Sequence, residues 1–481
     1  MKQLKNNHFN VLIPVEELKE FLLFNTLTGG IEVLKESEGI FLSQVSMLKS
    51  FHTGDYLDYQ SLIEYLFEKE YLLEEDNDLL DTLEKHVSTT QFVNSKTINL
   101  TIGTTIACNM GCSYCFEFVK PNHTLKSDQV KVQIAHYIEQ IITANKQVDT
   151  LSVTWYGGEP LINIQAIEDL SEAFINLTRK YNITYVANVI TNGIYLTQSN
   201  VAKLIKYKVS SAQVTIDGSK ITHDVKRPLK SKNGQNYDLI LKNLSSIPEE
   251  LKIAIRINID REVAYSIYQM LDDFEALNIW PQRKTQFHFD TAWLRSYDQI
   301  TLTEDEEAKK LSIEEYFDFK QHFRVNLVER YNKWADLQGF KKAKLKWDLP
   351  KYQSTCATWA SPISLVIDPN GNIHKCWETI HDDTLAPTSV FTDYNPSYFK
   401  SYSSFNRYTH SAVCRNCSYL PVCDKISCSY EALRSTVPKC TEWKYKTASY
   451  LREQYLRMVN LPDSIVTPTS VSAINSGHSN K

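Results

Sequence analysis

Apolar positions follow two alternating periods over much of this chain. Between residues 98 and 290, short apolar runs typical of buried strands alternate with stretches of helical spacing. The expected strands are Ile98–Ile106, Leu151–Tyr156, Thr184–Ile190, Ala212–Ile216, Ile253–Ile259 and Gln286–Asp290. The expected helices include Asp128–Ile142, Asn163–Lys180, Gln198–Lys206, Gln235–Leu244 and Ala264–Leu277. Six such units predict an α/β fold whose parallel sheet forms an open, partial (β/α)6 barrel, two units short of a closed eight-unit barrel.

The first 95 residues show a different pattern and are expected to form a small separate unit. Phe21–Leu34 places two apolar runs around a turn-rich centre, as in a β-hairpin, and Asp58–Tyr71 has apolar residues at helical spacing. The acidic segment Glu74–Asp81 is expected to be a surface connection or the start of a helix. At the other end, Tyr445–Val459 has a helical pattern, and Ser464–Lys481 is expected to be a disordered tail.

Composition narrows the class of protein. The 481 residues suffice for two to four domains, and a formal charge of −5 argues against a nucleic-acid binder with a basic surface. No apolar run has the length of a signal peptide or a membrane span. With ten cysteines and no export signal, the sequence predicts a cytoplasmic protein whose cysteines bind metal rather than form disulfides. Neither nucleic acid nor a membrane is an expected partner.

Three of the cysteines lie within eight residues, directly after the first expected strand. Cys108, Cys112 and Cys115 have the spacing C-x3-C-x2-C. Three thiolates on one loop can hold three irons of a 4Fe–4S cluster and leave the fourth iron open to another molecule. Gly111 is expected to take a positive φ, so that the loop wraps closely around the cluster. A zinc loop or a disulfide pair is the plainer alternative.

Other strand ends carry glycine-rich and polar turns. Gly157-Gly158-Glu159-Pro160 follows the second strand, and its close-approaching backbone and negative charge suit a bound ammonium group. Thr191-Asn192-Gly193 follows the third strand, and Thr215-Ile216-Asp217-Gly218 ends the fourth. Each turn alone is more typical of an ordinary strand-to-helix connection. Their shared position at the carboxyl ends of parallel strands, beside the cysteine loop, favours a ligand site.

Together these motifs resemble the radical S-adenosylmethionine (SAM) superfamily. The resemblance implies that Cys108, Cys112 and Cys115 hold a cluster whose open iron is chelated by SAM. Reductive cleavage of SAM then gives a 5′-deoxyadenosyl radical, which abstracts hydrogen from a substrate in a dry pocket. The residues that the resemblance places near SAM are Tyr114 at the adenine, Gly157, Gly158, Glu159 and Pro160 at the methionyl amine, Asn192, and Thr215. Arg256 is expected to meet a carboxylate, with a surface salt bridge as an equal alternative.

The other seven cysteines lie in the second half of the chain. Cys356 and Cys376 flank a strand–turn–strand hairpin around Pro369-Asn370-Gly371, which is expected to bring the two cysteines together. The remaining five are Cys414, Cys417, Cys423, Cys428 and Cys440. A zinc ribbon has two C-x2-C pairs, whereas only Cys414 and Cys417 have that spacing here, so a zinc ribbon is disfavoured.

This second pattern resembles the SPASM extension of radical SAM enzymes, which binds two auxiliary iron–sulfur clusters. The gap of four residues between Cys423 and Cys428 departs from the usual three. By the resemblance, a distal 4Fe–4S cluster is held by Cys414, Cys417, Cys423 and Cys440, and an inner one by Cys356, Cys376 and Cys428. Three complete sites need eleven thiolates, and the chain has ten. The missing inner ligand is a water, another side chain or a substrate thiolate.

The expected organisation has five parts. They are a winged-helix-like leader-peptide recognition domain (1–95), the radical SAM partial barrel (96–320), a connecting helical segment (321–350), the SPASM domain (351–445), and a C-terminal helix with its tail (446–481). The first part resembles the domain that, in enzymes modifying ribosomally made peptides, binds a leader as an added strand. A plain packing domain is the alternative.

The resemblance therefore predicts a peptide maturase that closes a crosslink in a precursor peptide, a thioether rather than a carbon–carbon bond. An electron donor such as flavodoxin or ferredoxin is an expected partner. An alternative is an anaerobic sulfatase-maturating enzyme, but that family has a fourth inner cysteine and an Asp directly after the hairpin cysteine. Here Trp377 and Glu378 follow Cys376. An alternative of another class is a non-catalytic metal-binding module with zinc at the cysteines.

Overall fold

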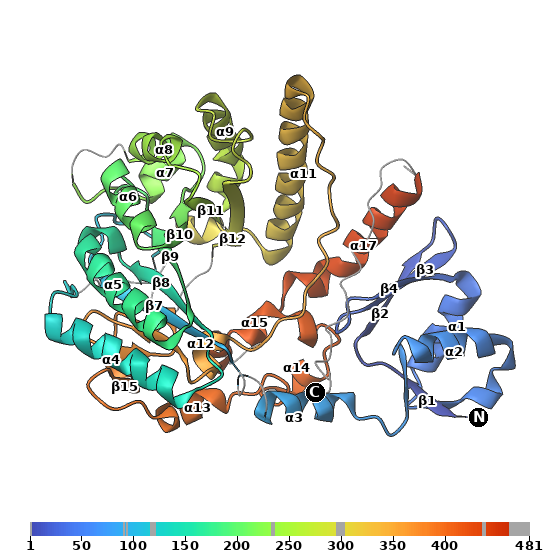
Figure 1. The fold of residues 1–481 in the computed structure, drawn as a ribbon. Coiled ribbons are helices and arrows are strands. Elements are labelled where there is room, and N and C mark those ends of the chain that lie inside the picture. Colours follow the sequence, from blue (N-terminus) through green and yellow to red (C-terminus); the bar gives the residue numbers. More distant parts are fainter. Residues whose placement is uncertain are drawn as a thin grey trace.

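A nine-stranded sheet forms the centre of the computed structural model, which describes residues 2–89, 92, 95–115, 122–231, 236–294, 304–434 and 439–460 (Figure 1). The strand order is β12-β11-β10-β9-β8-β7-β13-β14-β15. The barrel strands are β7 (Thr97–Thr105), β8 (Thr150–Gly157), β9 (Thr184–Thr191), β10 (Val209–Thr215), β11 (Lys252–Ile259) and β12 (Phe287–Trp293). Neighbours among these six all run parallel, so the predicted partial (β/α)6 barrel is confirmed.

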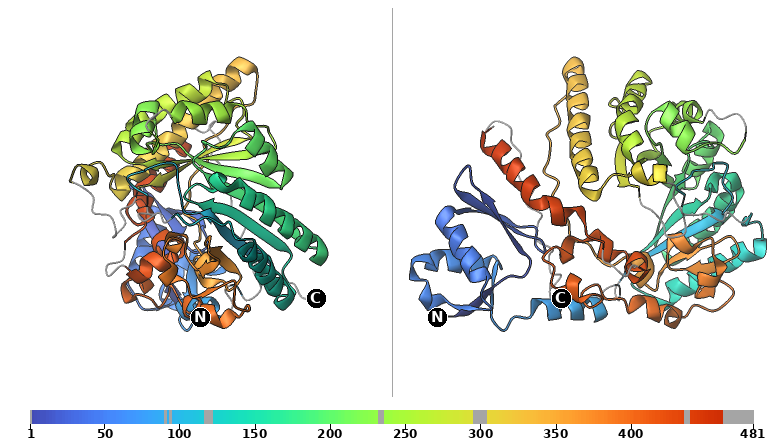
Figure 2. Two further views of the ribbon diagram at one scale, coloured as in Figure 1. Left: turned by 90° about the vertical axis from the view of Figure 1, so that its left-hand side faces the viewer. Right: turned by 180° about the vertical axis from the view of Figure 1, so that it is seen from behind.

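Helices cover the outer face of this curved sheet (Figures 1 and 2). They are α4 (Asp128–Ala144), α5 (Ile164–Tyr181), α6 (Gln198–Lys206), α7 (Lys220–Lys226), α8 (Tyr237–Ser245), α9 (Arg261–Ala276) and α11 (Ile313–Gln338), with the short α10 (Glu304–Ala308) before the last. Strand and helix side chains meet in one apolar core that includes Trp155, Phe174 and Phe274. Side-chain caps from Ser127 and Asp260 begin α4 and α9, which fixes where the connecting loops end.

The sheet continues past β7 into the cysteine-rich part of the chain. β13 (Ser364–Ile367) pairs in parallel with β7, and Ile367 lies opposite Ile102. β13 and β14 (Asn372–His374) form the predicted hairpin, and β15 (Thr388–Ser389) adds at its outer side. All four residues of β13 are buried. The cysteine-rich part is therefore joined to the barrel by a shared sheet, which apolar periodicity alone did not predict.

The remaining cysteine-rich part consists of loops and short helices, before the long α17 (Glu442–Asn460). They are α12 (Ala357–Ala360), α13 (Lys400–Ser403), α14 (Ala412–Arg415), α15 (Asp424–Ser427) and α16 (Ser429–Arg434). The expected boundary at residue 320 falls inside α11, because a capping box at Ser312 begins this helix and Gly339, with a φ of 71°, ends it. Residues 340–350 have no regular secondary structure, so the expected helical connection is wrong there. The expected tail, 464–481, lies outside the described residues.

The N-terminal unit contains two three-stranded antiparallel sheets and three helices. One sheet consists of β2 (Asn10–Val15), β3 (Glu20–Asn25) and β4 (Ile31–Lys35), and the other of β5 (Phe51–His52), β1 (Gln3–Asn6) and β6 (Leu72–Glu74). The helices are α1 (Glu36–Ser46), α2 (Gln60–Glu68) and α3 (Leu79–Thr89). The predicted hairpin is β3–β4, and the predicted helix is α2.

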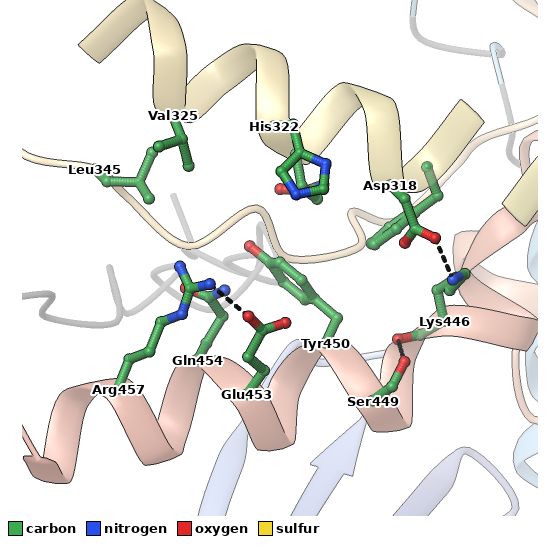
Figure 3. Close-up of a pocket in the computed structure, with 12 residues that line it drawn as sticks. Asp318, His322, Val325, Leu345, Lys446, Ser449, Tyr450, Glu453, Gln454 and Arg457 are labelled. Carbon is green, nitrogen blue, oxygen red and sulfur yellow. Dashed lines mark hydrogen bonds and ion pairs between the residues drawn. The ribbon is translucent and has the colours of Figure 1, made fainter. Parts of the chain in front are cut away.

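Helix α17 connects the N-terminal unit to the barrel. Leu22 and Phe24 of β3 pack against α17, whereas Leu23 faces α1 and α2. On the barrel side, α17 packs against Phe317 of α11, and a pocket with about 590 Å³ of empty space lies between the two helices (Figure 3). The ion pair between Asp318 and Lys446, 2.7 Å, spans this pocket. None of the helices that the structure describes combines the length and apolar character needed to cross a membrane.

Candidate active site

The carboxyl ends of the barrel strands border an open cavity with about 1460 Å³ of empty space. Residues from five separate sequence motifs line it. They include Cys108, Cys112, Tyr114 and Cys115 of the first loop, Gly157 and Gly158 after β8, Asn192 after β9, Thr215 at the end of β10, and Arg256 on β11. The fold thus brings most of the predicted site residues together. Glu159 and Pro160 do not line the cavity, because both are buried behind the turn.

The sulfur of Cys108 receives hydrogen bonds from the chain around it. The Met110 backbone N–H donates to Cys108 Sγ at 3.4 Å, and the Asn192 amide lies 4.0 Å from the same atom. Asn192 Nδ2 also donates to Asn109 Oδ1 at 2.7 Å. Donors directed at a sulfur stabilise its thiolate, the form that binds iron.

Backbone pairing holds the other side of the cysteine loop. Gly111 N donates to Pro228 O, and Lys230 N donates to Asn109 O, both at 2.9 Å. Gly111 has no positive φ, and an added Cβ would meet only Lys230 Cγ, at 4.0 Å. The expectation of a left-handed glycine was therefore wrong. The pairing with residues 228–230, far along the chain, shapes the loop instead.

The Gly157–Pro160 turn packs tightly against the start of the cysteine loop. Gly158 N donates to Thr105 O at 2.9 Å. A Cβ on Gly157 would lie 2.0 Å from Thr105 O, and one on Gly158 would lie 2.3 Å from Ile106 O. Gly157 also has a φ of 128°. Only glycine permits this approach of the two loops.

The Glu159 carboxylate is fully buried and acts as a positioning group. Its Oε1 accepts from the Thr191 hydroxyl at 2.7 Å and from Leu161 N at 3.1 Å, and its Oε2 accepts from Asn192 N at 2.7 Å. Burial raises the pKa of Glu159, and the three hydrogen bonds oppose that shift. Glu159 therefore ties the turn at Asn192 to the glycine turn, and its carboxylate does not line the cavity.

Tyr114 belongs to a buried polar network. Its hydroxyl bonds to the Asp217 carboxylate and accepts from Arg227 Nη1 at 2.6 Å and from Asn258 Nδ2 at 3.3 Å. Asn258 N donates to Asp217 Oδ1 at 2.8 Å. Burial raises the pKa of Asp217, and the nearby Arg227 cation opposes this shift. The network fixes the ring of Tyr114 at the cavity wall.

Arg227 is a site residue that sequence reasoning missed. Its guanidinium lines the cavity close to Cys112, and only 8% of the residue is exposed. Its Nε is buried and has no hydrogen-bond partner among the described residues. A buried cation with a spare donor fits a bound anionic group such as a carboxylate. The seven-residue helix α7 and the return of the chain at Pro228 bring Arg227 here, and neither has a clear sequence signal.

Arg256 also faces this cavity, from the middle of β11. Its Nε lies 3.5 Å from Asn258 Oδ1. It forms no ion pair with any residue of the described ranges, so the alternative of a surface salt bridge is not seen there. Arg256 is therefore a second cation at the wall of this cavity.

The inner cysteines lie close to one another, and the residues directly after Cys376 line the same cavity. Cys356 N donates to Ser427 O at 3.0 Å, which places Cys356 beside Cys428. Burial raises the pKa of the Cys376 thiol, and the nearby Cys428 and Cys356 contribute to the shift. Trp377 and Glu378, directly after Cys376, line the cavity. An indole and a carboxylate thus lie between the inner cysteines and the space near Cys108.

The four remaining cysteines lie between α14 and the start of α17. Cys417 N donates to Cys414 O at 3.0 Å, and Lys444 Nζ donates to Cys440 Sγ at 3.6 Å. Burial raises the pKa of Cys423, while backbone N–H groups of Ile426 and Lys425 bond to its sulfur and oppose the shift. Such donors fit thiolate ligands of an iron–sulfur cluster.

The described residues contain neither a disulfide nor a site for a single metal ion. None of the ten cysteines, all of which the structure describes, forms a disulfide. No three Cys, His, Asp or Glu side chains within the described ranges converge on a point where one metal ion would bind.

Comparison with known proteins identifies the barrel. The family model of the radical SAM superfamily matches residues 102–262. The solved structure of anSMEcpe with bound AdoMet superposes with a TM-score of 0.54 at 15% identity, covering 76% of this chain and 100% of that one. SuiB of Streptococcus suis, bound to its precursor peptide SuiA, gives a TM-score of 0.49 at 17% identity, over 91% and 98% of the chains. The first of these likenesses shows the fold.

Two curated proteins match part of the sequence. The radical SAM cyclopropyl synthase TigE of Paramaledivibacter caminithermalis is 25% identical over 258 residues, which are 45% of this chain and 52% of TigE. An uncharacterised protein of Methanocaldococcus jannaschii is 26% identical over 142 residues, 30% of this chain and 46% of that protein. The chain thus spans about half the length of the curated relatives it matches.

Proposed function

Because this chain is a radical SAM enzyme, we propose that it matures a precursor peptide by closing a crosslink within it. Hydrogen abstraction by the 5′-deoxyadenosyl radical would leave a carbon radical on the peptide, which then bonds to a second side chain. The observation that carries the proposal is an open edge strand, β4, in the N-terminal unit. A strand-binding edge has a use in an enzyme whose substrate is an extended peptide.

The residues of the cavity account for the first half of this reaction. Cys108, Cys112 and Cys115 would hold the 4Fe–4S cluster, which supplies the electron that cleaves SAM. Gly157 and Gly158 have no side chains, so their backbone would allow close contact with the methionyl amine. The remaining contacts would come from Tyr114 at the adenine, Arg227 at the carboxylate, and Asn192 and Thr215 beside them. Space toward Arg256, Trp293 and Trp377 is left for a substrate side chain.

The inner cysteines support a thioether as the product. Three thiolates from Cys356, Cys376 and Cys428 leave one ligand position, which a substrate thiolate or the nearby Glu378 carboxylate would occupy. The auxiliary clusters supply an acceptor for the one electron that is released, with the thiol proton, when a carbon radical and a thiol form a C–S bond. Flavodoxin or ferredoxin is the class of donor that would restore electrons to the enzyme.

The geometry of β4 supports binding of a leader at its open edge. β4 pairs only with β3 among the described strands. Asn25 N donates to Gly30 O at 2.9 Å, which sets the alternation of the ladder so that Glu32 and Leu34 bond to β3. The backbone groups of Val33 therefore point to the open edge, and its side chain is 47% exposed. A leader strand added here would lie beside α2, whose Tyr65 hydroxyl bonds to Glu32.

The substitution Val33→Pro tests this proposal. It removes an outward-facing N–H while the inner ladder bonds through Glu32 and Leu34 stay intact. We expect the reduced Val33→Pro enzyme to cleave SAM without peptide as the parent does, but to lose modification of a leader-bearing precursor peptide, for which short reading frames beside the gene would be screened. The measurement is peptide mass, in which a crosslink appears as the loss of two hydrogen atoms.

Val33→Thr is the matched control and should modify the peptide normally. Equal modification by the Val33→Pro and parent enzymes would reject leader binding at β4. An unchanged precursor peptide together with conversion of a sulfatase peptide to formylglycine would favour the sulfatase-maturating alternative. Zinc in place of iron in the purified protein would favour the non-catalytic module.

A further inference from the structure

The N-terminal unit contacts the cysteine-rich part at the distal cysteines. Helix α3 lies beside α14 in Figure 1, and the two units share one apolar cluster. The buried members are Phe9 and Val87 from the N-terminal unit and Tyr408, Leu420 and Ile426 from the cysteine-rich part. Packed against them are Leu27, Leu79, Leu80, Leu83, Ala432 and the side chains of Cys414 and Cys423. Two distal thiols therefore lie against a wall that N-terminal residues help to build.

Polar contacts fix the same junction. Glu84 of α3 pairs with Arg415 at 2.6 Å, and the Glu84 carbonyl accepts from Asn406 Nδ2 at 3.0 Å. The Thr26 hydroxyl bonds to the carbonyl of Ser418. Arg415 and Ser418 both lie in the loop that carries Cys414 and Cys417. The contact is thus made to the distal cysteine loop itself, on both sides of Cys417.

The physical consequence of this junction is that it limits the access of water to the distal cysteines. Access of solvent to a cluster controls both its reduction potential and its resistance to oxidation. Phe9 is fully buried, although its neighbours across the junction belong to a segment 400 residues away. Without the N-terminal residues, the apolar side of Cys414 and Cys423 would face water. Conversely, the leucines of α3 have their apolar partners in this wall.

We propose that the N-terminal unit closes the pocket of the distal cluster, so that retention of this cluster and seating of the N-terminal unit depend on each other. This inference rests on the distal cluster of the proposed function. It gives the N-terminal unit a task besides leader binding. Because the N-terminal unit would both bind the leader and cover the distal cluster, its displacement would expose this cluster to water.

The test is Leu83→Glu in the full-length reconstituted enzyme. The substitution places a charge in the wall but leaves the separate core of β3, α1 and α2 untouched. We expect it to lose about four of about twelve irons, or to bleach several-fold faster in air, while the cluster at Cys108 persists. Iron and sulfide analysis and Mössbauer spectroscopy measure the change. Leu57→Glu, at an exposed leucine of the same unit, is the matched control.

The reciprocal test uses Cys414→Ser and Cys417→Ser together. Hydrogen exchange should rise in residues 79–87 and around Phe9, while the β3–β4 hairpin stays protected. Arg415→Ala offers a milder break of the junction and should bleach at an intermediate rate. Parental iron content and bleaching in both Leu83→Glu and Arg415→Ala would overturn the inference. A parent enzyme whose iron content does not fall in the Cys414→Ser/Cys417→Ser variant would show that no distal cluster is bound and would also overturn the inference, whereas the crosslinking proposal is tested separately by peptide mass.

Discussion

Replacement of Gly158 by alanine tests whether tight loop packing positions the SAM site. The new Cβ would lie 2.3 Å from Ile106 O and 2.5 Å from Ala107 O. Both oxygens belong to the backbone, so the loops must separate by about 1 Å to restore an ordinary contact. Such overpacking costs about 1–3 kcal/mol. Because the displaced segment leads directly into Cys108, the separation moves the cluster loop relative to the glycine turn.

We expect the Gly158→Ala enzyme to bind iron as the parent does but to form 5′-deoxyadenosine about 100-fold more slowly, since a 1 Å misplacement has roughly that effect on rate. Cys108 keeps its own hydrogen bonds from Met110 and Asn192, which is why iron should remain. The assay is anaerobic: dithionite-reduced enzyme, saturating SAM, and chromatographic detection of 5′-deoxyadenosine. Iron content is measured on the same samples.

Gly111→Ala is the matched control, because this glycine lies inside the cysteine loop with an ordinary φ and open space for a Cβ. It should keep the parental rate. A parental rate for Gly158→Ala would contradict positioning of SAM by the contact between the two loops. Equal damage in both variants would show that any substitution near the cysteines suffices, and that the close approach at Gly158 has no special part.

Three further substitutions address other parts of the site. Cys112→Ala should abolish 5′-deoxyadenosine formation and remove about four irons, and persistent product would reject the cluster assignment. Tyr114→Phe leaves Asp217 and Arg227 without a shared hydrogen-bond partner, a loss that costs about 1–3 kcal/mol. SAM affinity, measured by titration, should therefore fall about tenfold or more. Parental affinity would contradict a role of this network in SAM binding. Glu159→Gln should change the pH dependence of the free energy of unfolding. Burial raises the native pKa of Glu159, so its contribution to the free energy of unfolding is full below the unfolded pKa near 4.3 and is lost as pH rises through the native pKa. In urea titrations, the parent should therefore lose stability relative to the variant as pH rises. A difference in stability that does not change with pH would argue against this.

Local patterns were sufficient to predict the barrel. Each expected barrel strand overlaps an observed one, because these strands bury apolar residues in short runs or at alternate positions, between helices of clear period. The gathering of Cys108, Gly157, Asn192 and Thr215 followed from one rule, that parallel strands end at the same edge. These are properties of the sequence within about 40 residues of each position.

Contacts between distant segments were not predictable in this way. The pairing of β13 with β7 joins residues more than 260 positions apart, and no period reports it. The position of Arg227 depends on how the chain returns after α7 to pair with the cysteine loop. Glu159 turns inward because Thr191, Asn192 and Leu161 supply three donors behind the turn. Motif spacing shows which residues are near the site, but not which side chains face it.

The pairing of β13 with β7 also determines how the cysteine loop and Cys376 can move relative to each other. One ladder of hydrogen bonds carries the radical-forming loop at the end of β7 and, through the hairpin that begins with β13, Cys376. Adjacent strands in a sheet stay about 4.8 Å apart, so a closing motion of the barrel would carry both sites together. In the proposed reaction, the sheet would therefore fix the distance between the site where the peptide radical forms and the inner thiols. A peptide whose two reacting residues do not match that span would be rejected by distance alone.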